Sequence, residues 1–344
     1  MVKTKLCLVG AGSIGRRHLR LLSLREDVTL CVVEPNEACK AAVAQEHPQM
    51  PFFDSMEAAV TEGGCEAVII ATPHRTHAPL AIQALELGAH VFVEKPMSDS
   101  LEDCVALLNA AKKSDKVVAV GFMFRFDPFV QKVKEIIDSG RIGNIIHYSS
   151  RFATYNTLRC SVTRHQEHTP YSLVMDCIHD SDLLYHFTGR IPDYAYSVAY
   201  KAGDMPLSSP QNFIDTIYRW EDNSMGAHVH FNYVQHPQIH DLQIVGDKGY
   251  ILGDFMSADV TVGSREGTTE TYANTRSCIN TDFNNVYRSE WNEFLRAVRG
   301  ERKAENPPEQ AIVSTLLMYS QIESGKAGHE VNIHEIAERY GYQY

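Results

Sequence analysis

Gly10-Ala11-Gly12-Ser13-Ile14-Gly15 directly follows the short apolar segment Lys5–Val9 and opens a helical pattern at Gly15–Leu24. A GxGxxG sequence between a strand and a helix is typical of dinucleotide-binding loops. There the glycines allow a tight turn, a close approach of the backbone to a pyrophosphate, and close helix–strand packing. The free N–H groups at the helix N-terminus also attract phosphates. We therefore expect a dinucleotide to contact Gly10, Gly12, Ser13, Ile14 and Gly15.

An acidic residue, Glu34, ends the second predicted strand, Val28–Val33. A carboxylate at this position accepts hydrogen bonds from the adenosine ribose hydroxyls and repels a 2′-phosphate. The next residues, Pro35 and Asn36, include no arginine that could bind such a phosphate. The sequence therefore favours NAD over NADP as the cofactor.

The first third of the chain, residues 1–122, alternates apolar strands with helical patterns. Such alternation is typical of an α/β domain with a doubly wound parallel sheet, the Rossmann arrangement. The predicted strands are Lys5–Val9, Val28–Val33, Ala67–Ala71, His90–Val93 and Val117–Gly121, and the predicted helices are Gly15–Leu24, Ala38–Glu46, Ser55–Thr61, Pro79–Leu87 and Leu101–Lys113. We therefore expect an NAD-binding domain over 1–122.

The pattern changes in residues 123–344. A strand at 145–155 and a helix at 173–188 precede a series of strands separated by turns, and two helices close the chain. The later strands are predicted at Tyr194–Tyr200, Phe213–Trp220, Gly226–Tyr233, Asp241–Val245, Tyr250–Gly253 and Asp259–Val262, and the closing helices near Val286–Arg299 and Pro308–Gly325. This order predicts an α+β domain with a large, mostly antiparallel open sheet.

Bulk composition excludes several classes of protein. The net charge of -11 argues against nucleic-acid binding, which needs basic patches. The basic cluster Arg16–Arg20 is either a solvated helix face or an aid to attracting the cofactor's phosphates. Eight cysteines without a CxxC pair indicate a reducing compartment, and no apolar run is long enough for a membrane span or signal sequence. We expect a soluble, cytoplasmic protein.

Glu94-Lys95-Pro96 follows the predicted strand His90–Val93. Ligands of open α/β sheets gather at the carboxyl ends of strands, so Glu94 and Lys95 are expected beside the cofactor, together with Thr72 and Pro73 after Ala67–Ala71. A partly desolvated lysine there can exchange a proton with a substrate hydroxyl. The alternative is a surface lysine paired with Glu94. His77 either reaches the nicotinamide side or makes only local bonds at a helix start.

A third candidate group lies in Asp176-Cys177-Ile178-His179-Asp180. On the predicted helix 173–188 the side chains of Asp176, His179 and Asp180 share one face. Histidine titrates near neutral pH and a carboxylate one turn away can orient it, although a buried histidine can also be purely structural. A metal could in principle bind His165 and His168 with Asp176 and His179, or His228 with His230. Their spacings match no familiar site, so no metal is expected.

These motifs together resemble the Gfo/Idh/MocA oxidoreductase family, which includes glucose–fructose oxidoreductase and inositol dehydrogenases. The resemblance extends over Val9–His18, Ile70–His77, Gly88–Pro96, Gly121–Phe126, Gly140–Gly143 and Asp176–Asp182. It implies that Lys95 is the catalytic lysine, that His179 is a catalytic or substrate-binding histidine, and that the open sheet joins subunits into a homodimer or homotetramer.

Two departures from the family pattern concern the helix that carries His179. Many members have an aspartate four residues before the histidine, where this chain has Met175. Asp176, three residues before it, resembles a subgroup involved in sugar modification. Pro170-Tyr171-Ser172-Leu173 replaces the glycine-rich segment that precedes this helix in many relatives.

The resemblance implies an NAD-dependent dehydrogenase for a secondary alcohol of a sugar, sugar derivative or cyclitol, or for the corresponding ketone. Lys95 and His179, with Asp176, are expected to handle the hydroxyl proton, and Arg125, Arg164 and Tyr171 to line the substrate pocket. Two alternatives stay open: an enzyme that cleaves glycosides with bound NAD, and a non-catalytic NAD- and sugar-sensing regulator. The presence of both Lys95 and His179 favours an enzyme.

Overall fold

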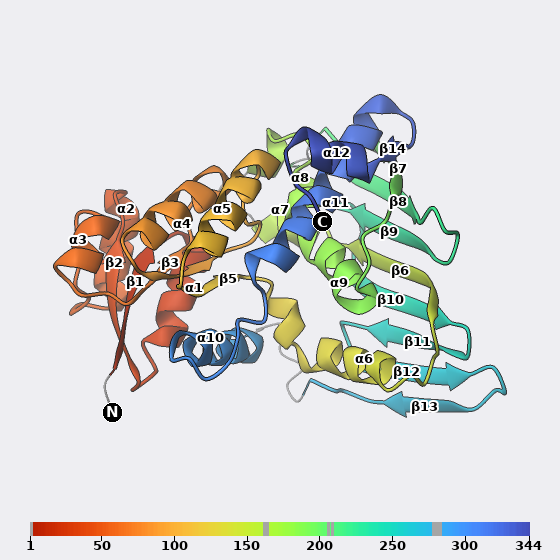
Figure 1. Ribbon diagram of the computed structural model, residues 1–344, viewed down its shortest axis with the longest axis horizontal. Coiled ribbons are helices and arrows are strands. Elements are labelled where there is room, and N and C mark those ends of the chain that lie inside the picture. Colours follow the sequence, from red (N-terminus) through yellow and green to blue (C-terminus); the bar gives the residue numbers. More distant parts are fainter. Residues whose placement is uncertain (1–2, 161–164, 205–206, 208–209, 277–283) are drawn as a thin grey trace. The chain divides into compact units, whose positions relative to one another are not determined.

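The computed structural model describes residues 3–160, 165–204, 207, 210–276 and 284–344 (Figure 1). For His165 it describes the backbone alone. The chain forms two compact units. Unit 1 comprises Met1–Met123 and Asp282–Thr315, and unit 2 comprises Phe124–Thr281 and Leu316–Tyr344. Among the described residues, the helices lack the combined length and apolar character that crossing a bilayer requires.

Unit 1 contains a five-stranded sheet in the order β2-β1-β3-β4-β5, in which all paired strands are parallel. Its elements are β1 (Thr4–Val9), α1 (Ser13–Leu22), β2 (Val28–Val33), α2 (Glu37–Glu46), α3 (Met56–Thr61), β3 (Ala67–Ile70), η1 (His74–Thr76), α4 (His77–Glu86), β4 (His90–Val93), α5 (Leu101–Lys113), β5 (Val118–Val120) and α10 (Asn284–Val298). The strands are mostly apolar and buried, apart from the exposed Lys5 on β1 and Thr29 on β2, as expected of a parallel sheet covered on both faces. The predicted Rossmann fold is confirmed.

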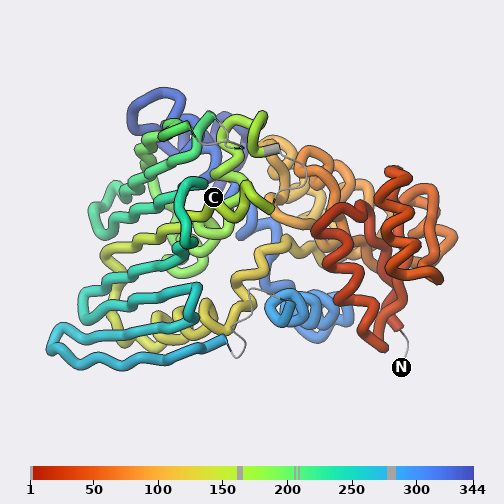
Figure 2. The backbone as a smooth tube through the Cα atoms, turned by 180° about the vertical axis from the view of Figure 1, so that it is seen from behind, coloured from red at the N-terminus to blue at the C-terminus, as the bar shows by residue number. Residues whose placement is uncertain are grey.

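The helix α10 joins unit 1 although it follows unit 1's last strand by more than 160 residues (Figure 2). Its apolar residues Tyr287, Trp291 and Phe294 recur at helical spacing, so they form one buried stripe. The Trp291 ring lies 4.4 Å from the ring of Phe92 on β4. By its contacts Asp282–Thr315 thus packs with unit 1, whereas the sequence placed it in the second domain; the domain division at residue 122 stays a prediction.

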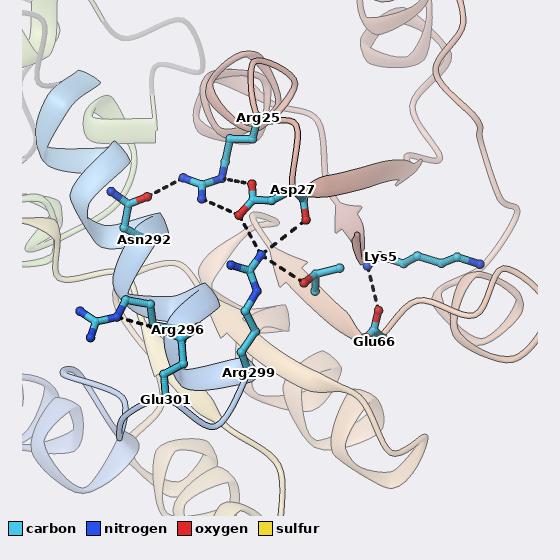
Figure 3. Close-up of polar contacts among 9 residues, drawn as sticks. Lys5, Arg25, Asp27, Glu66, Asn292, Arg296, Arg299 and Glu301 are labelled. Carbon is cyan, nitrogen blue, oxygen red and sulfur yellow. Dashed lines mark hydrogen bonds and ion pairs between the residues drawn. The ribbon is translucent and has the colours of Figure 1, made fainter. Parts of the chain in front are cut away.

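Polar contacts join α10 and the residue that follows it, Arg299, to the segment between α1 and β2 (Figure 3). Arg25 donates a hydrogen bond of 2.5 Å to Asn292, and Arg299 forms a 2.8 Å ion pair with Asp27. Asp27 also accepts from Arg25, and these guanidinium groups hold the pKa of its carboxyl well below the usual value. The position of α10 in unit 1 is thus set by both apolar and charged contacts.

Unit 2 contains a nine-stranded sheet in the order β13-β12-β11-β10-β6-β9-β8-β7-β14. The strands are β6 (Ile145–Ala153), β7 (Tyr194–Tyr200), β8 (Phe213–Arg219), β9 (Gly226–Asn232), β10 (Ile239–Gly246), β11 (Gly249–Asp254), β12 (Asp259–Ser264), β13 (Thr269–Tyr272) and β14 (Val331–Asn332). All neighbours pair antiparallel except β6 and β9, which are parallel. The predicted large, mostly antiparallel sheet is confirmed.

Helices cover one face of this sheet. They are α6 (Pro128–Asp138), α7 (Asn156–Cys160), α8 (Ser172–Asp176), α9 (Ile178–Thr188), α11 (Pro308–Ala327, whose first part belongs to unit 1) and α12 (Ile333–Arg339), with the 3₁₀ turns η2 (Met123–Phe126) and η3 (His165–Glu167). Figure 1 shows α6 and α9 along this face. Side chains alternate accordingly, as in β6, where Tyr148 is buried and His147 is exposed.

The predicted helix 173–188 is two helices. The first, α8, ends at Asp176 and the second, α9, begins at Ile178, because Cys177 between them departs from helical geometry with φ -90° and ψ 13°. Asp176 and His179 therefore lie on different helices, and the expectation that they share one helical face with Asp180 was wrong.

Candidate active site

The glycine loop in unit 1 has the geometry that its sequence predicts. Gly10 has φ +90°, and a side-chain carbon there would lie 2.7 Å from the Ala71 carbonyl oxygen. A side-chain carbon at Gly15 would lie 2.1 Å from the Gly10 carbonyl oxygen, so both positions require glycine. Gly12, the N-cap of α1, has open space on its side-chain side. The loop thus leaves room for a phosphate against the uncapped N-terminus of α1.

Glu34 is fixed at the carboxyl end of β2. Its Oε2 accepts a 2.6 Å hydrogen bond from the Ala11 N–H and its Oε1 a 2.7 Å bond from the Asn36 N–H. These two bonds tie the carboxylate to the glycine loop, and each oxygen keeps a lone pair for a ribose hydroxyl. The carboxylate is half-buried, where a ligand can reach it.

His77, the first residue of α4, connects the segments that follow β3 and β4. Its Nε2 lies 2.8 Å from the Thr72 carbonyl oxygen and its Nδ1 lies 2.8 Å from the Pro96 carbonyl oxygen. The ring is buried, with 1% of its surface exposed. The bond to Pro96 joins residues that are 19 positions apart. His77 therefore makes more than the local bonds that one of the two sequence interpretations expected at the start of a helix. His77 positions the chain beside Lys95.

Glu94 directly follows β4 and is buried in unit 1. Its Oε1 lies 2.6 Å from His18 Nε2, and its Oε2 accepts a 3.1 Å bond from the Lys95 N–H. Burial raises the pKa of this carboxyl, but the hydrogen bond from His18 and the positive charge of Lys95 outweigh burial and lower it. A negative charge therefore lies beside the half-buried Lys95.

In unit 2, His179 lies near the start of α9, with its ring 4.7 Å from that of Phe124. Asp176 at the end of α8 accepts hydrogen bonds at Oδ2 from Gln166 Nε2, at 3.0 Å, and from the Tyr233 hydroxyl. Burial, and then the charge of Asp176, raise the pKa of Tyr233 well above its usual value. Asp180 instead forms a buried pair with His240, at 3.2 Å.

Three residues are predicted to line the substrate pocket, namely Arg125, Arg164 and Tyr171. Arg125 is 4% exposed and forms a bidentate ion pair with Asp182, with bonds of 2.8 and 2.6 Å. This pair holds the guanidinium group inside unit 2. Tyr171 is buried in an αL conformation directly before α8, and burial raises the pKa of its hydroxyl. Arg164 lies outside the described residues. Their roles in substrate binding stay predictions.

The histidine pair on the open sheet face contacts an acid. Asp215 accepts hydrogen bonds from His228, at 3.2 Å, and from His230, at 2.7 Å, and both lower the pKa of its carboxyl. Within the described ranges, no group of three or more His, Cys, Asp or Glu side chains has an arrangement that could hold a metal ion.

Three buried residues of unit 1 were not predicted from the sequence. His18 was grouped with a basic helix face, yet it is fully buried against Glu94. Trp291, which donates a 3.2 Å hydrogen bond to His18 Nδ1, and Glu290 lie on α10. Helical periodicity could have shown that α10 has a buried stripe, but not which sheet it covers.

Comparisons with known proteins agree with this architecture. A family model described as an oxidoreductase family with an NAD-binding Rossmann fold matches residues 4–122, and the model of the family's C-terminal alpha/beta domain matches residues 134–333. The crystal structure of scyllo-inositol dehydrogenase from Lactobacillus casei, with bound NAD(H) and scyllo-inositol, has a TM-score of 0.82 at 21% identity and covers 96% of this chain and 99% of that one. This likeness shows the fold.

Among curated relatives, inositol 2-dehydrogenase of Corynebacterium glutamicum is 32% identical over 142 residues, which are 40% of this chain and 42% of the relative. The scyllo-inositol 2-dehydrogenase (NAD(+)) of Bacillus subtilis is 27% identical over 313 residues, 86% of each chain. The match thus spans less than half of the first relative and most of the second. Because the family models match both units, the chain belongs to the Gfo/Idh/MocA oxidoreductase family.

Proposed function

We propose that this protein is an NAD-dependent dehydrogenase that oxidises a secondary alcohol of a cyclitol or sugar, or reduces the corresponding ketone. The observation that carries the proposal is the placement of Lys95, which is half-buried at the carboxyl end of β4 beside the buried charge of Glu94. The similarity over most of the chain to scyllo-inositol 2-dehydrogenase (NAD(+)) supports a cyclitol substrate.

The residues of unit 1 fit an NAD molecule. The open side of Gly12 and the N-terminus of α1 would hold the pyrophosphate, and Glu34 would bind the adenosine ribose. When bound, NAD supplies the hydride acceptor. Lys95 would take the proton of the substrate hydroxyl as the hydride leaves the same carbon, and His179, a residue of unit 2, would bind and orient that hydroxyl.

A screen of inositol isomers, sugars and polyols with NAD, followed by NADH absorbance, tests this function. We expect NADH to form with at least one cyclitol or sugar, and with none when the hydroxyls are blocked as methyl ethers. Failure of every compound in the oxidation assay, and of the matching ketones in the reduction assay, would refute the proposal.

A second candidate is chemistry without net oxidation. A 206-residue segment, 59% of this chain and 54% of the relative, is 30% identical to the 2,7-anhydro-N-acetylneuraminate hydratase of Escherichia coli. Hydration changes no net oxidation state, so an enzyme of that kind would convert its substrate while free NADH stays constant. Product analysis by mass spectrometry in the same screen separates the two candidates.

Cofactor choice gives the first prediction. NAD is expected to bind at least about tenfold more tightly than NADP, about 1.4 kcal/mol, because the fixed carboxylate of Glu34 repels a 2′-phosphate. Calorimetric titration with both dinucleotides measures the difference. The double variant Glu34→Ser, Pro35→Arg should reduce or reverse the preference, while Glu37→Ser, at an exposed acid on the next helix, should leave it unchanged. Tighter binding of NADP by the wild type would contradict the assignment.

We also propose that the open face of the nine-stranded sheet joins subunits into a homodimer or homotetramer. Large apolar side chains are exposed on strands of this sheet, namely Tyr196, Val198, Tyr200, Ile217 and Leu252. Exposed apolar surface of this kind is typical of subunit interfaces. Light scattering should give a mass of two or four chains for the wild type and a lower mass for Ile217→Lys, and a monomeric wild type would exclude the interface.

A further inference from the structure

His77 is a buried histidine of unit 1 whose two ring nitrogens both contact backbone carbonyl groups. Its Nε2 lies 2.8 Å from the Thr72 carbonyl oxygen, and its Nδ1 lies 2.8 Å from the Pro96 carbonyl oxygen. The ring is almost fully shielded from solvent, with 1% of the residue exposed. The protonation state of the ring is therefore set by these two contacts.

Both partners of the His77 ring are acceptors. A carbonyl oxygen can only accept a hydrogen bond, so each contact needs an N–H group on the histidine side. A neutral imidazole has one N–H, and its other nitrogen carries a lone pair. In either neutral tautomer this lone pair would face a carbonyl oxygen at 2.8 Å, which is repulsive. The geometry thus requires a proton on both nitrogens, which makes the ring an imidazolium.

Another buried histidine of unit 1, His18, has the opposite pattern of partners. The Trp291 indole can only donate, so its 3.2 Å bond requires a lone pair on His18 Nδ1. The proton of the His18 ring is then on Nε2, which donates a 2.6 Å bond to Glu94 Oε1. His18 is therefore a neutral ring, and it provides an internal reference for His77.

A buried cation such as the His77 ring needs compensation, because burial disfavours charged groups. The N-terminus of α4, where His77 lies, adds an unfavourable partial positive charge. Two charge-assisted bonds to carbonyl oxygens act in the other direction. The Glu94 carboxylate does so too. Burial raises the pKa of this carboxyl, but the hydrogen bond from His18 and the positive charges of Lys95 and His77 outweigh burial and lower it.

The two carbonyl groups belong to neighbouring segments at the carboxyl ends of β3 and β4. The Glu94 N–H donates a 2.9 Å bond to the Ile70 carbonyl oxygen at the end of the ladder between these strands. Thr72 and Pro96 lie two residues further along their segments, where the His77 ring joins them. The ring thus connects the two segments beyond the end of the backbone ladder.

We propose that His77 is a buried imidazolium that ties Pro96 to Thr72 and thereby positions Lys95. Lys95 lies between two fixed neighbours. The Glu94 carboxylate accepts its backbone N–H at 3.1 Å, and His77 holds the carbonyl group of the next residue. His77 is a positioning residue, because its effect on the reaction passes through Lys95. The inference rests on the proposed role of Lys95 in proton transfer.

Neutron diffraction from crystals of the protein grown in D₂O at neutral pH tests the charge of His77 without any activity measurement. Deuterium should appear on both Nδ1 and Nε2 of His77. In the same map, His18 should carry deuterium on Nε2 alone. A single deuterium on the His77 ring would overturn the proposal, whatever the activity of the enzyme.

His77→Gln tests the positioning role, because its single neutral amide nitrogen cannot replace two ring nitrogens that point to different carbonyl groups. We expect kcat to fall by about 10–100-fold, as for a small misplacement of a catalytic group. The same change in a Lys95→Met background should lower the residual kcat no further, since both changes act through one side chain. His74→Gln, at a partly exposed ring three residues earlier, is the matched control and should keep the wild-type kcat.

Two kinetic outcomes would overturn the positioning role. One is a wild-type kcat for His77→Gln, and the other is an equal fold-loss in the wild-type and Lys95→Met backgrounds, which indicates a general structural defect. The neutron result decides the charge of His77 even if His77→Gln fails to fold. A Lys95→Met enzyme with full activity would instead refute the proposed function, and it would leave the number of deuterium atoms on His77 unchanged.

Discussion

Replacing Lys95 by methionine is expected to lower kcat by about 10²–10⁴-fold, the usual cost of losing a general acid–base group. Methionine keeps the length and apolar volume of the lysine chain but has no titratable amine. The glycine loop and the Glu34 carboxylate do not involve the Lys95 side chain, so NAD affinity and thermal unfolding should stay at the wild-type level. Steady-state kinetics with the substrate found in the screen measures the effect.

Lys116→Met is the matched control for this variant. Lys116 precedes β5, at the amino end of the sheet, where its ammonium pairs with Asp115 at 3.5 Å. It should keep full turnover. A Lys95→Met enzyme that retains more than about a tenth of the wild-type kcat would lie outside the expected range and require another proton carrier. His179→Ala in the same assay should lower kcat without changing NAD affinity, and full activity would make His179 structural.

Asp182→Asn is expected to destabilise the protein by about 3–5 kcal/mol, because it leaves the Arg125 guanidinium buried without its counter-charge. Both side chains are almost fully buried, with 1% and 2% of their surface exposed, and their bidentate contact joins η2 to α9. The midpoint of urea unfolding, followed by circular dichroism with NAD absent, should fall accordingly.

Asp222→Asn provides the control for Asp182→Asn. The Arg190–Asp222 pair has a similar distance, 2.8 Å, but its side chains are 43% and 55% exposed, so its loss should cost about 0–1 kcal/mol. The double variant Arg125→Met, Asp182→Leu should recover much of the stability, since it removes both buried charges. Equal unfolding midpoints for Asp182→Asn and Asp222→Asn would show that burial does not set the strength of the Arg125–Asp182 pair.

Local patterns were sufficient to predict most of the fold. The five strands of unit 1 are predicted within one residue at each end, because mostly apolar runs bounded by turns and helices are distinctive. Glu34 was placed correctly at the end of β2 for the same reason. Two strands that were not predicted lack such a pattern, since β13 is polar and exposed and β14 has two residues. The helix α6 was also not predicted, although its buried Val130, Val133 and Ile136 recur at helical spacing.

The contacts that complete the site are non-local and could not be predicted. His18 and Trp291 meet across 273 positions, so no local pattern joins them. The apolar periodicity of 173–188 continues through Cys177, and the break there becomes visible only with the bonds that Asp176 makes to Gln166 and Tyr233. The ion pair of Arg125 with Asp182, 57 residues away, has no local signal either.

Transfer of deuterium shows most directly whether hydride passes from the substrate to NAD. The substrate found in the screen would be labelled with deuterium on the carbon that bears the reacting hydroxyl, and the NADH formed would be analysed by mass spectrometry. One deuterium is expected in each NADH molecule, because the hydride passes directly from that carbon to the nicotinamide. NADH without deuterium, or substrate conversion with no NADH formed, would contradict it.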